Sequence, residues 1–177
     1  MSSRFERIWA TTGFDGSIFK VLRGRFRHED GSEVEREWVE HGGAVGVVAH
    51  DGEHVFLVRQ PREAVGAPDL LEVPAGKLDV EGEAPLETAK RELAEEIGKA
   101  AEHWEPLGRF YTSPGFTNEE VQLFLATGLS DVPQPEVHED ERIDIVTHPL
   151  AELDSLLGEV RDSKTLIGLL QLRLRLR

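Results

Sequence analysis

The chain of 177 residues contains no cysteine, and none of its apolar runs approaches the length of a membrane span. Without cysteine, neither a disulfide framework nor a thiolate metal site is possible. A bilayer-spanning helix needs about 20 apolar residues, and the opening residues MSSRFERIW lack the apolar core of a signal peptide. These absences predict a cytoplasmic protein without a membrane partner.

Basic residues are also few, because 20 lysines and arginines stand against 34 aspartates and glutamates, for a formal net charge of −14. A protein that binds nucleic acid generally carries a basic face, so we expect no nucleic-acid partner. A small anionic substrate can still bind where local arginines and metal ions reverse the field. The length allows one substantial core, or one core with a small appendage.

Apolar runs separated by turn signals predict a chain made mostly of strands. The expected strands cover residues 17–27, 33–40, 43–49, 54–62, 70–73, 106–113, 121–128 and 142–146, and the expected helices cover about 85–97, 150–158 and a longer stretch from 163. Strands and helices alternate irregularly, which favours an α+β class over a doubly wound sheet. We expect a small N-terminal β domain over residues 1–40 and a second domain over residues 41–177.

The most informative segment is GKLDVEGEAPLETAKRELAEEIG, which runs from Gly76 to Gly98. Pro85 suits the first turn of a helix and Gly98 suits the position just after its end. The helix would present one apolar face to the core, made of Leu86, Ala89, Leu93 and Ile97.

Three glutamates, Glu92, Glu95 and Glu96, lie one turn apart on this helix, with Arg91 beside them. Like charges at i and i+4 destabilise a helix by roughly a few tenths of a kcal/mol per pair. The cluster therefore predicts a cation nearby, and a hard divalent metal used in phosphate chemistry is the main candidate. A solvated acidic surface is the alternative for any such helix taken alone.

The segment resembles the Nudix box, G-x5-E-x7-R-E-U-x-E-E-x-G-U, where U is aliphatic. The matching residues are Gly76, Glu83, Arg91, Glu92, Leu93, Glu95, Glu96 and Gly98. Two departures occur: six residues instead of five follow Gly76, and Lys99 takes the final aliphatic position. The resemblance implies a Nudix fold, an α/β/α sandwich with a mixed sheet, preceded here by a small antiparallel β domain.

The resemblance also implies an enzyme that hydrolyses a nucleoside diphosphate linked to another group, with Mg²⁺ or Mn²⁺ as cofactor. On this basis Glu92 and Glu96 are the main metal ligands, Glu95 supports or bridges, and the carbonyl of Ala75 is a further ligand. Glu83 and Arg91 match the pair that forms a salt bridge within the motif.

Further segments resemble the ADP-ribose pyrophosphatase branch of this superfamily, namely VEHGGAVGVVA, LVRQPR, LLEVPAG, YTSPGFTNE and DSKTLIGLL. Pro114, about fifteen residues after the box, is a mark of that branch, although a proline in a turn needs no functional reason. The expected reaction converts ADP-ribose to AMP and ribose 5-phosphate. Alternatives are another nucleoside diphosphate sugar such as ADP-glucose or GDP-mannose, a non-catalytic nucleotide-sugar sensor, and an enzyme that removes oxidised nucleoside triphosphates.

Substrate contacts follow from the same resemblance. Arg62 would bind the diphosphate or terminal ribose, with a surface arginine as the alternative, and Glu72 would contact the ribose or a metal-bound water. The remaining candidates are Arg36 and Glu37 at the adenine end, Phe19 stacked on adenine or simply in the core, and Ser113, Gly115 and Phe116 around the ribose. The general base would be Glu139, or alternatively Glu141, on the acidic loop.

Members of this branch form homodimers in which the N-terminal β domain is exchanged between subunits. A sheet of three or fewer strands has little to pack against by itself, so a homodimer is also physically reasonable for residues 1–40, and the resemblance implies that it is domain-swapped.

Overall fold

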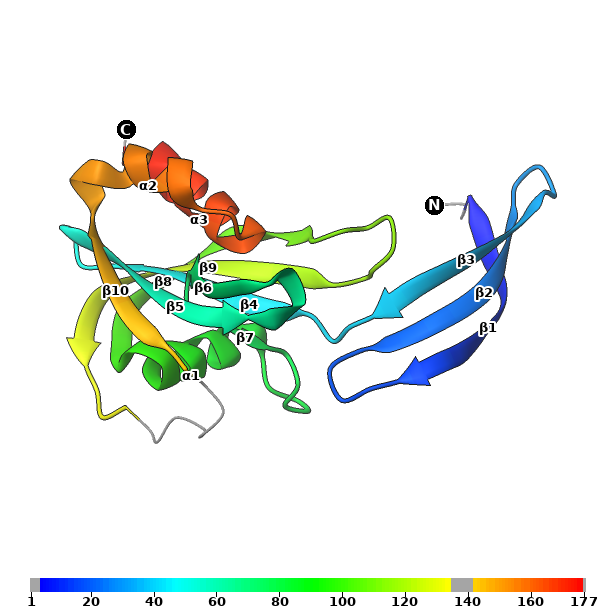
Figure 1. Cartoon of the computed structure of the whole chain (residues 1–177), viewed down its shortest axis with the longest axis horizontal. Helices are drawn as coiled ribbons and strands as arrows, with labels where there is room; N and C mark the ends of the chain where they lie inside the picture. The colour runs from blue at the N-terminus through cyan, green and yellow to red at the C-terminus, as the bar shows by residue number, and fades with distance from the viewer. Residues whose placement is uncertain (1–3, 135–141, 177) are drawn as a thin grey trace. The chain divides into compact units, whose positions relative to one another are not determined.

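The computed structural model describes residues 4–134 and 142–176, and the chain divides into two compact units (Figure 1). The first unit combines the residues up to Gly43 with the segment Tyr111–Glu120, and the second contains Ala44–Phe110 and Val121–Arg177. Each unit has its own β-sheet, and among the described residues helices occur only in the second unit. The α+β class is confirmed, whereas a domain boundary at residue 40 remains a prediction.

The first unit is an antiparallel sheet of three strands in the order β1-β2-β3. The strands are β1 (Phe5–Asp15), β2 (Lys20–His28) and β3 (Glu33–Glu40). The HEDGS turn forms the hairpin between β2 and β3 as predicted, with Gly31 at φ 81° and Ser32 donating to Asp30. We did not predict β1, whose side chains are all exposed and therefore lack the two-residue alternation of a half-buried strand.

The segment Tyr111–Glu120 joins this unit along the edge of β3. The backbone N–H of Val39 donates to the carbonyl of Phe116 at 2.7 Å, and the carbonyl of Val39 accepts from the N–H of Asn118 at 3.2 Å. The side-chain oxygen of Asn118 also accepts from the N–H of His41 at 2.8 Å. The segment is therefore fixed to the sheet by backbone pairing.

The second unit contains a mixed sheet in the order β10-β5-β4-β9-β8, with β6 beside β5 and β7 beside β4. The pairing of β4 is antiparallel with β5 and parallel with β9. The strands are β4 (Ala44–His50), β5 (His54–Arg62), β6 (Ala67–Glu72), β7 (Ala75–Lys77), β8 (Lys99–Tyr111), β9 (Glu120–Asp131) and β10 (Asp144–Pro149). Strand β8 thus begins directly after the helix, earlier than the start expected at residue 106.

Helices cover both faces of this sheet (Figure 1). They are α1 (Pro85–Ile97) on one face and α2 (Leu153–Glu159) and α3 (Ser163–Arg175) on the other, with short 3-10 turns at Glu63–Val65 and Leu150–Glu152. Successive side chains of β4 point to opposite faces of the sheet. Val47 packs in the cluster with Leu93 of α1, and Val48 packs in the cluster with Leu169 of α3. The sandwich expected from the sequence is confirmed.

No helix within residues 4–134 and 142–176 is long and apolar enough to cross a membrane.

Candidate functional site

Helix α1 carries the acidic cluster, and both of its ends are defined. Pro85 lies in the first turn, and Gly98 ends the helix in the left-handed conformation with φ 63°, as the sequence predicts. At the C-terminus, the side-chain amide of Gln134 donates to the carbonyls of Glu95 at 2.8 Å and Glu96 at 3.1 Å. These bonds satisfy carbonyls that have no partner inside the helix.

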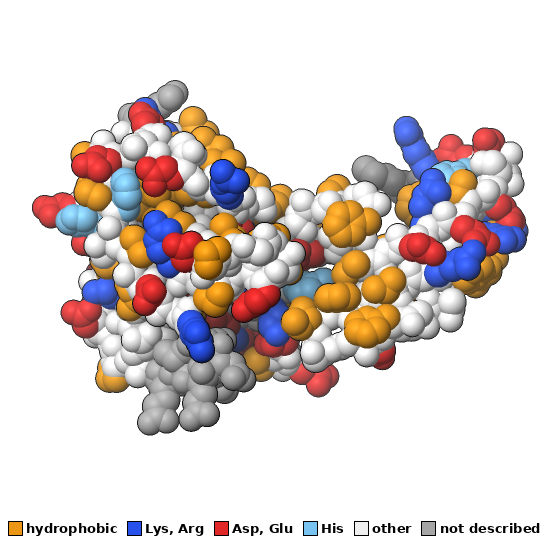
Figure 2. All heavy atoms as spheres, viewed as in Figure 1, with side chains coloured by type: hydrophobic (Ala, Val, Ile, Leu, Met, Phe, Trp, Pro, Cys, Tyr) orange, Lys and Arg blue, Asp and Glu red, His pale blue; other side chains and the backbone are white. Residues whose placement is uncertain are grey.

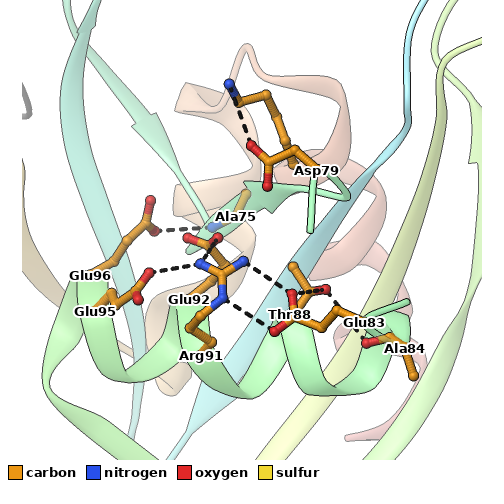
Figure 3. A network of polar contacts seen from close by, with 10 residues as sticks. Ala75, Asp79, Glu83, Ala84, Thr88, Arg91, Glu92, Glu95 and Glu96 are labelled. Atoms are coloured by element: carbon orange, nitrogen blue, oxygen red, sulfur yellow. Dashed lines mark hydrogen bonds and ion pairs between the residues drawn. The ribbon is translucent and has the colours of Figure 1, made fainter. Parts of the chain in front are cut away.

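Arg91 is the centre of the polar network on this helix (Figure 3). Its Nη2 donates to Glu83 at 3.2 Å, and its Nη1 donates to Glu92 at 2.8 Å and to Glu95 at 2.9 Å. The hydrogen bond to Glu83 is the main cause that raises the pKa of Arg91, and bonds from Arg91 and Thr88 lower the pKa of Glu83. The Glu83–Arg91 salt bridge is confirmed, and one guanidinium binds three carboxylates, so the group keeps a net negative charge.

The carboxylate of Glu92 rests directly on the backbone of Gly76. A Cβ added at Gly76 would lie 2.0 Å from the Cδ and Oε1 atoms of Glu92. This distance is far below van der Waals contact, so the observed position of Glu92 requires glycine at residue 76. The glycine of the motif therefore makes room for one of the acidic side chains.

Glu96 is held by the backbone of β7. Its Oε2 accepts from the N–H of Ala75 at 3.0 Å, and the residue is only 7% exposed. Pairing of Ala75 with Gly46 fixes this short strand against β4. A buried carboxylate of this kind needs such a donor or a cation beside it.

In its chemistry, the donor set on α1 and β7 fits a hard divalent cation, because Glu92, Glu95 and Glu96 offer carboxylates and Ala75 offers a carbonyl. Among the residues that the structure describes, no three acidic or histidine side chains form a ready-made metal group. In this conformation Arg91 binds Glu92 and Glu95, and the N–H of Ala75 binds Glu96 (Figure 3). A cation would take over oxygens that protein donors hold in this conformation.

A second charged cluster lies in the same unit and contains the predicted residues Arg62 and Glu72. Arg62 donates to Glu72 through Nε at 2.6 Å and Nη2 at 3.0 Å, and Lys164 binds the same carboxylate. Burial raises the pKa of Glu72, but the bonds and charges of Arg62 and Lys164 outweigh this and leave the pKa below its usual range. Glu72 is therefore an ionised carboxylate with both oxygens bound.

Lys164 and Asp162 are site residues that we did not predict. Asp162 caps α3 by accepting from the N–H of Thr165 at 2.9 Å, and it lies 3.1 Å from the Nζ of Lys164. An aspartate directly before the first residue of an apolar helix is an N-cap signal, and it could have identified Asp162 as the cap. The partnership with Glu72, 92 residues away, has no local signal in the sequence.

Four of the predicted adenine and ribose residues line a cavity of about 510 Å³ within the first unit. These four are Arg36, Glu37, Gly115 and Phe116. The cavity has a largely aromatic wall, made of Phe5, Phe26, His28, Trp38 and Phe116. Arg7, from the strand that we did not predict, adds a second arginine to its lining.

Two other candidates of the first unit lie outside this lining. Phe19 packs against Phe14, with ring centroids 6.0 Å apart, and is 39% exposed. Ser113 contributes its carbonyl to the loop turn by accepting from the N–H of Phe116. The candidate bases Glu139 and Glu141 lie outside the described residues.

Both departures from the motif have a structural explanation. The longer loop after Gly76 contains a turn in which the N–H of Glu83 donates to the carbonyl of Val80 at 3.1 Å, so the helix register is kept. Lys99 pairs with Asp131 at 2.5 Å and lies 5.2 Å from the ring centroid of Phe56. Its stem covers apolar surface where an aliphatic residue would otherwise pack.

Comparison with known proteins adds to this description. The family model described as NUDIX domain matches residues 40–167. An ADP-ribose pyrophosphatase of Mycobacterium tuberculosis is 43% identical over 170 residues, which cover 94% of this chain and 82% of that protein. A methanol dehydrogenase activator of Bacillus methanolicus is 39% identical over 166 residues, which cover 92% and 89% of the two proteins. A crystal structure of an ADP compounds hydrolase shares the fold, with a TM-score of 0.85 at 23% identity over 98% of this chain and 95% of the other.

Proposed function

Because the chain belongs to the Nudix family, we propose that it hydrolyses ADP-ribose to AMP and ribose 5-phosphate. The observation that carries the reaction class is the gathering of Glu92, Glu95 and Glu96 on α1, with Glu96 bonded to Ala75 and Glu92 against Gly76 of β7. The choice of substrate is supported by the relative of Mycobacterium tuberculosis, an ADP-ribose pyrophosphatase that is 43% identical to this chain.

The metal is a divalent ion, for which we assign Mg²⁺ or Mn²⁺, held by Glu92, Glu95, Glu96 and the carbonyl of Ala75. When bound, such an ion supplies positive charge to the diphosphate and helps to activate water. Arg91 bonds to Glu92 and Glu95 and holds these two carboxylates close together before the ion arrives. Oxygen donors of this kind suit either ion.

In the proposed reaction a water molecule attacks one phosphorus, and the bond from that phosphorus to the bridging oxygen breaks. The proton of the water passes to a carboxylate, for which Glu139 is the first candidate and Glu141 the second. Arg62 binds the diphosphate or terminal ribose, since a guanidinium suits phosphate. Glu72, which Arg62 binds, is assigned to the ribose or to a metal-bound water.

The nucleoside side of the substrate is assigned to the first unit. Arg36 and Glu37 would hold the adenine end, with Phe19 stacked on the base, and Ser113, Gly115 and Phe116 would shape the ribose pocket. For Arg36, Glu37, Gly115 and Phe116, the cavity with its aromatic wall supports this assignment, because aromatic rings and a few charged groups suit a nucleoside. A homodimer that exchanges this unit between subunits, and a cytoplasmic location, complete the proposal.

Steady-state rates with ADP-ribose, ADP-glucose and GDP-mannose test the substrate, with AMP and ribose 5-phosphate identified as the products of the first. We expect kcat/KM to be highest for ADP-ribose in the presence of Mg²⁺. A preference for GDP-mannose would overturn the ADP-ribose assignment, and hydrolysis of none of the three would overturn the activity.

The Glu96→Gln variant tests the metal assignment. The amide oxygen of glutamine can still accept from Ala75, so the fold should be kept while a negative ligand is lost. We expect kcat with saturating Mg²⁺ to fall about 100-fold or more, a loss of about 2.7 kcal/mol of transition-state stabilisation. The matched control is Glu87→Gln on the exposed side of α1, where Glu87 pairs with Lys90 at 2.8 Å. Activity of Glu96→Gln close to that of Glu87→Gln would refute the assignment.

A further inference from the structure

Four charged side chains of the second unit, none of them on α1, form a cluster, and the charge of Glu96 on α1 also acts on Arg62. Arg62 and Lys164 are its cations, and Glu72 and Asp162 are its anions. Glu72 is 1% exposed, Lys164 14% and Asp162 15%, whereas Arg62 is 42% exposed. The cluster is thus a buried support with a single cation that reaches solvent.

Glu72 has little capacity left for a ligand of its own. One of its oxygens accepts from the Nε of Arg62, and the other is shared by the Nη2 of Arg62 and the Nζ of Lys164. A buried carboxylate that gave up these donors would lose its compensating charges. Glu72 therefore acts on a substrate through Arg62 more readily than by contact.

Arg62 is held along one edge only. Its Nε and Nη2 face Glu72, while its Nη1 has no hydrogen-bond partner among the residues that the structure describes. A guanidinium that is fixed in this way presents its remaining N–H groups in a defined direction. Such a group suits an oxygen of a phosphate.

Lys164 is fixed by the start of α3. Asp162 caps the helix and contacts Lys164, and the Oγ1 of Thr165 accepts at 2.8 Å from the N–H of Val73, the residue after Glu72. The first turn of α3 is therefore joined to the end of β6 at two neighbouring points. Lys164 cannot move without disturbing the carboxylate that holds Arg62.

We infer that Lys164 is a positioning residue, which acts through Glu72 to fix the guanidinium of Arg62 for a phosphate of the substrate. This inference rests on the proposed function, in which Arg62 binds the diphosphate. With Lys164 present, the charge of Glu72 is shared between two cations. Without it, the carboxylate of Glu72 would lose one of its two anchors, and the guanidinium of Arg62 that it holds would be less firmly fixed.

Kinetic constants for ADP-ribose test this inference with Lys164→Met, which removes the charge, and Lys164→Arg, which keeps it. We expect Lys164→Met to raise KM about tenfold while kcat changes by less than about threefold, and Lys164→Arg to recover most of the loss. The matched control is Arg173→Met on the same helix, where Arg173 pairs with Asp154 at 2.5 Å on the exposed side. Its KM should equal that of the wild type.

A double-mutant cycle with Glu72→Gln separates positioning from a general structural effect. In the Glu72→Gln protein, Lys164→Met should change KM by less than about twofold, because its route to Arg62 has been removed. If the effects of Lys164→Met and Glu72→Gln on KM simply multiplied in the double variant, the inference would be overturned. Should Lys164→Met not fold, Lys164→Gln replaces it, since its amide can still donate to Glu72.

A readout without substrate distinguishes this inference from the proposed function. In ligand-free protein, the exchange of the Arg62 Nε–H with water, followed by nitrogen-15 NMR, should quicken several-fold in Lys164→Met and not in Arg173→Met. If ADP-ribose is not hydrolysed but this exchange quickens, the proposed function fails and the positioning stands. If ADP-ribose is hydrolysed but KM and exchange stay at wild-type values in Lys164→Met, the positioning of Arg62 by Lys164 is wrong.

Discussion

Gly76 is the residue at which one added carbon atom would disturb the acidic site most directly. The side chain that a new Cβ would meet, at 2.0 Å, is the carboxylate end of Glu92. That end is flexible, whereas the backbone of β7 is held by its pairing with β4. An added methyl group should therefore displace Glu92 and leave the strand in place.

The Gly76→Ala variant should lose about 100-fold in kcat/KM, because displacement of a metal-binding group by about 1 Å has an effect of that size. Its free energy of unfolding should stay within about 1 kcal/mol of the wild-type value. Hydrolysis rates at several Mg²⁺ concentrations, together with urea unfolding, measure both quantities. The control is Gly158→Ala in α2, where an added Cβ meets no atom within 4 Å. Wild-type rates in Gly76→Ala would contradict the role of Glu92.

At the same scale, Arg91 shows why the cation beside the three glutamates of α1 could not be identified from the sequence. Three glutamates within two turns predict a cation, and a metal was the candidate considered. The structure supplies a cation from within the chain, since Arg91 bonds to Glu83, Glu92 and Glu95. Helical spacing shows which residues are neighbours, but not which donor each carboxylate takes.

At the scale of elements, local signals determine α1 and tertiary packing determines the Arg62 cluster. Pro85, Gly98 and the apolar spacing between them are sufficient to place α1, and its bounds agree with the prediction. The contact of Lys164 with Glu72 joins residues 92 positions apart and depends on how α3 packs on β6. No pattern within either segment specifies it, so it could not be predicted from the sequence.

The same cluster makes stability depend on pH. The charges and bonds of Arg62 and Lys164 outweigh burial and hold the pKa of Glu72 below its ordinary value, so the unfolded chain binds more protons in mild acid. The stabilisation from Glu72 is therefore fully present above the ordinary carboxylate pKa and is lost as the pH falls through the lower pKa of the folded state. This sign is the one typical of a paired carboxylate.

Glu72→Gln should lower the free energy of unfolding by about 3 kcal/mol near pH 7, and the difference from wild type should narrow as the pH falls below about 4.5. Urea unfolding at a series of pH values from about 3 to 8 measures this. Glu87→Gln on the exposed side of α1 is the control and should stay within about 0.5 kcal/mol of wild type throughout. If the difference in free energy of unfolding between wild type and Glu72→Gln were the same at every pH, the carboxylate of Glu72 would not be the cause of the pH dependence.

At the scale of the whole molecule, the first unit has too little apolar contact of its own for the aromatic residues that it carries. The strand β1 exposes Phe5, Ile8, Trp9 and Phe14, and Ile18 follows in the turn. Figure 2 shows hydrophobic side chains at the surface of this unit beside charged ones. A three-stranded sheet of this kind is only marginally stable unless another surface covers it. A second copy of the chain is the covering surface that we propose.

Sedimentation velocity should therefore show a particle of twice the 19.8 kDa chain mass at micromolar concentration. Ile8→Lys, which places a charge on exposed β1, should shift the protein towards monomer and lower activity, because the proposed site combines groups from two subunits. The control is Leu174→Lys, which changes an equally apolar residue, 61% exposed, at the end of α3. The Leu174→Lys protein should remain a dimer. A wild-type monomer, or an Ile8→Lys dimer with full activity, would contradict this assembly.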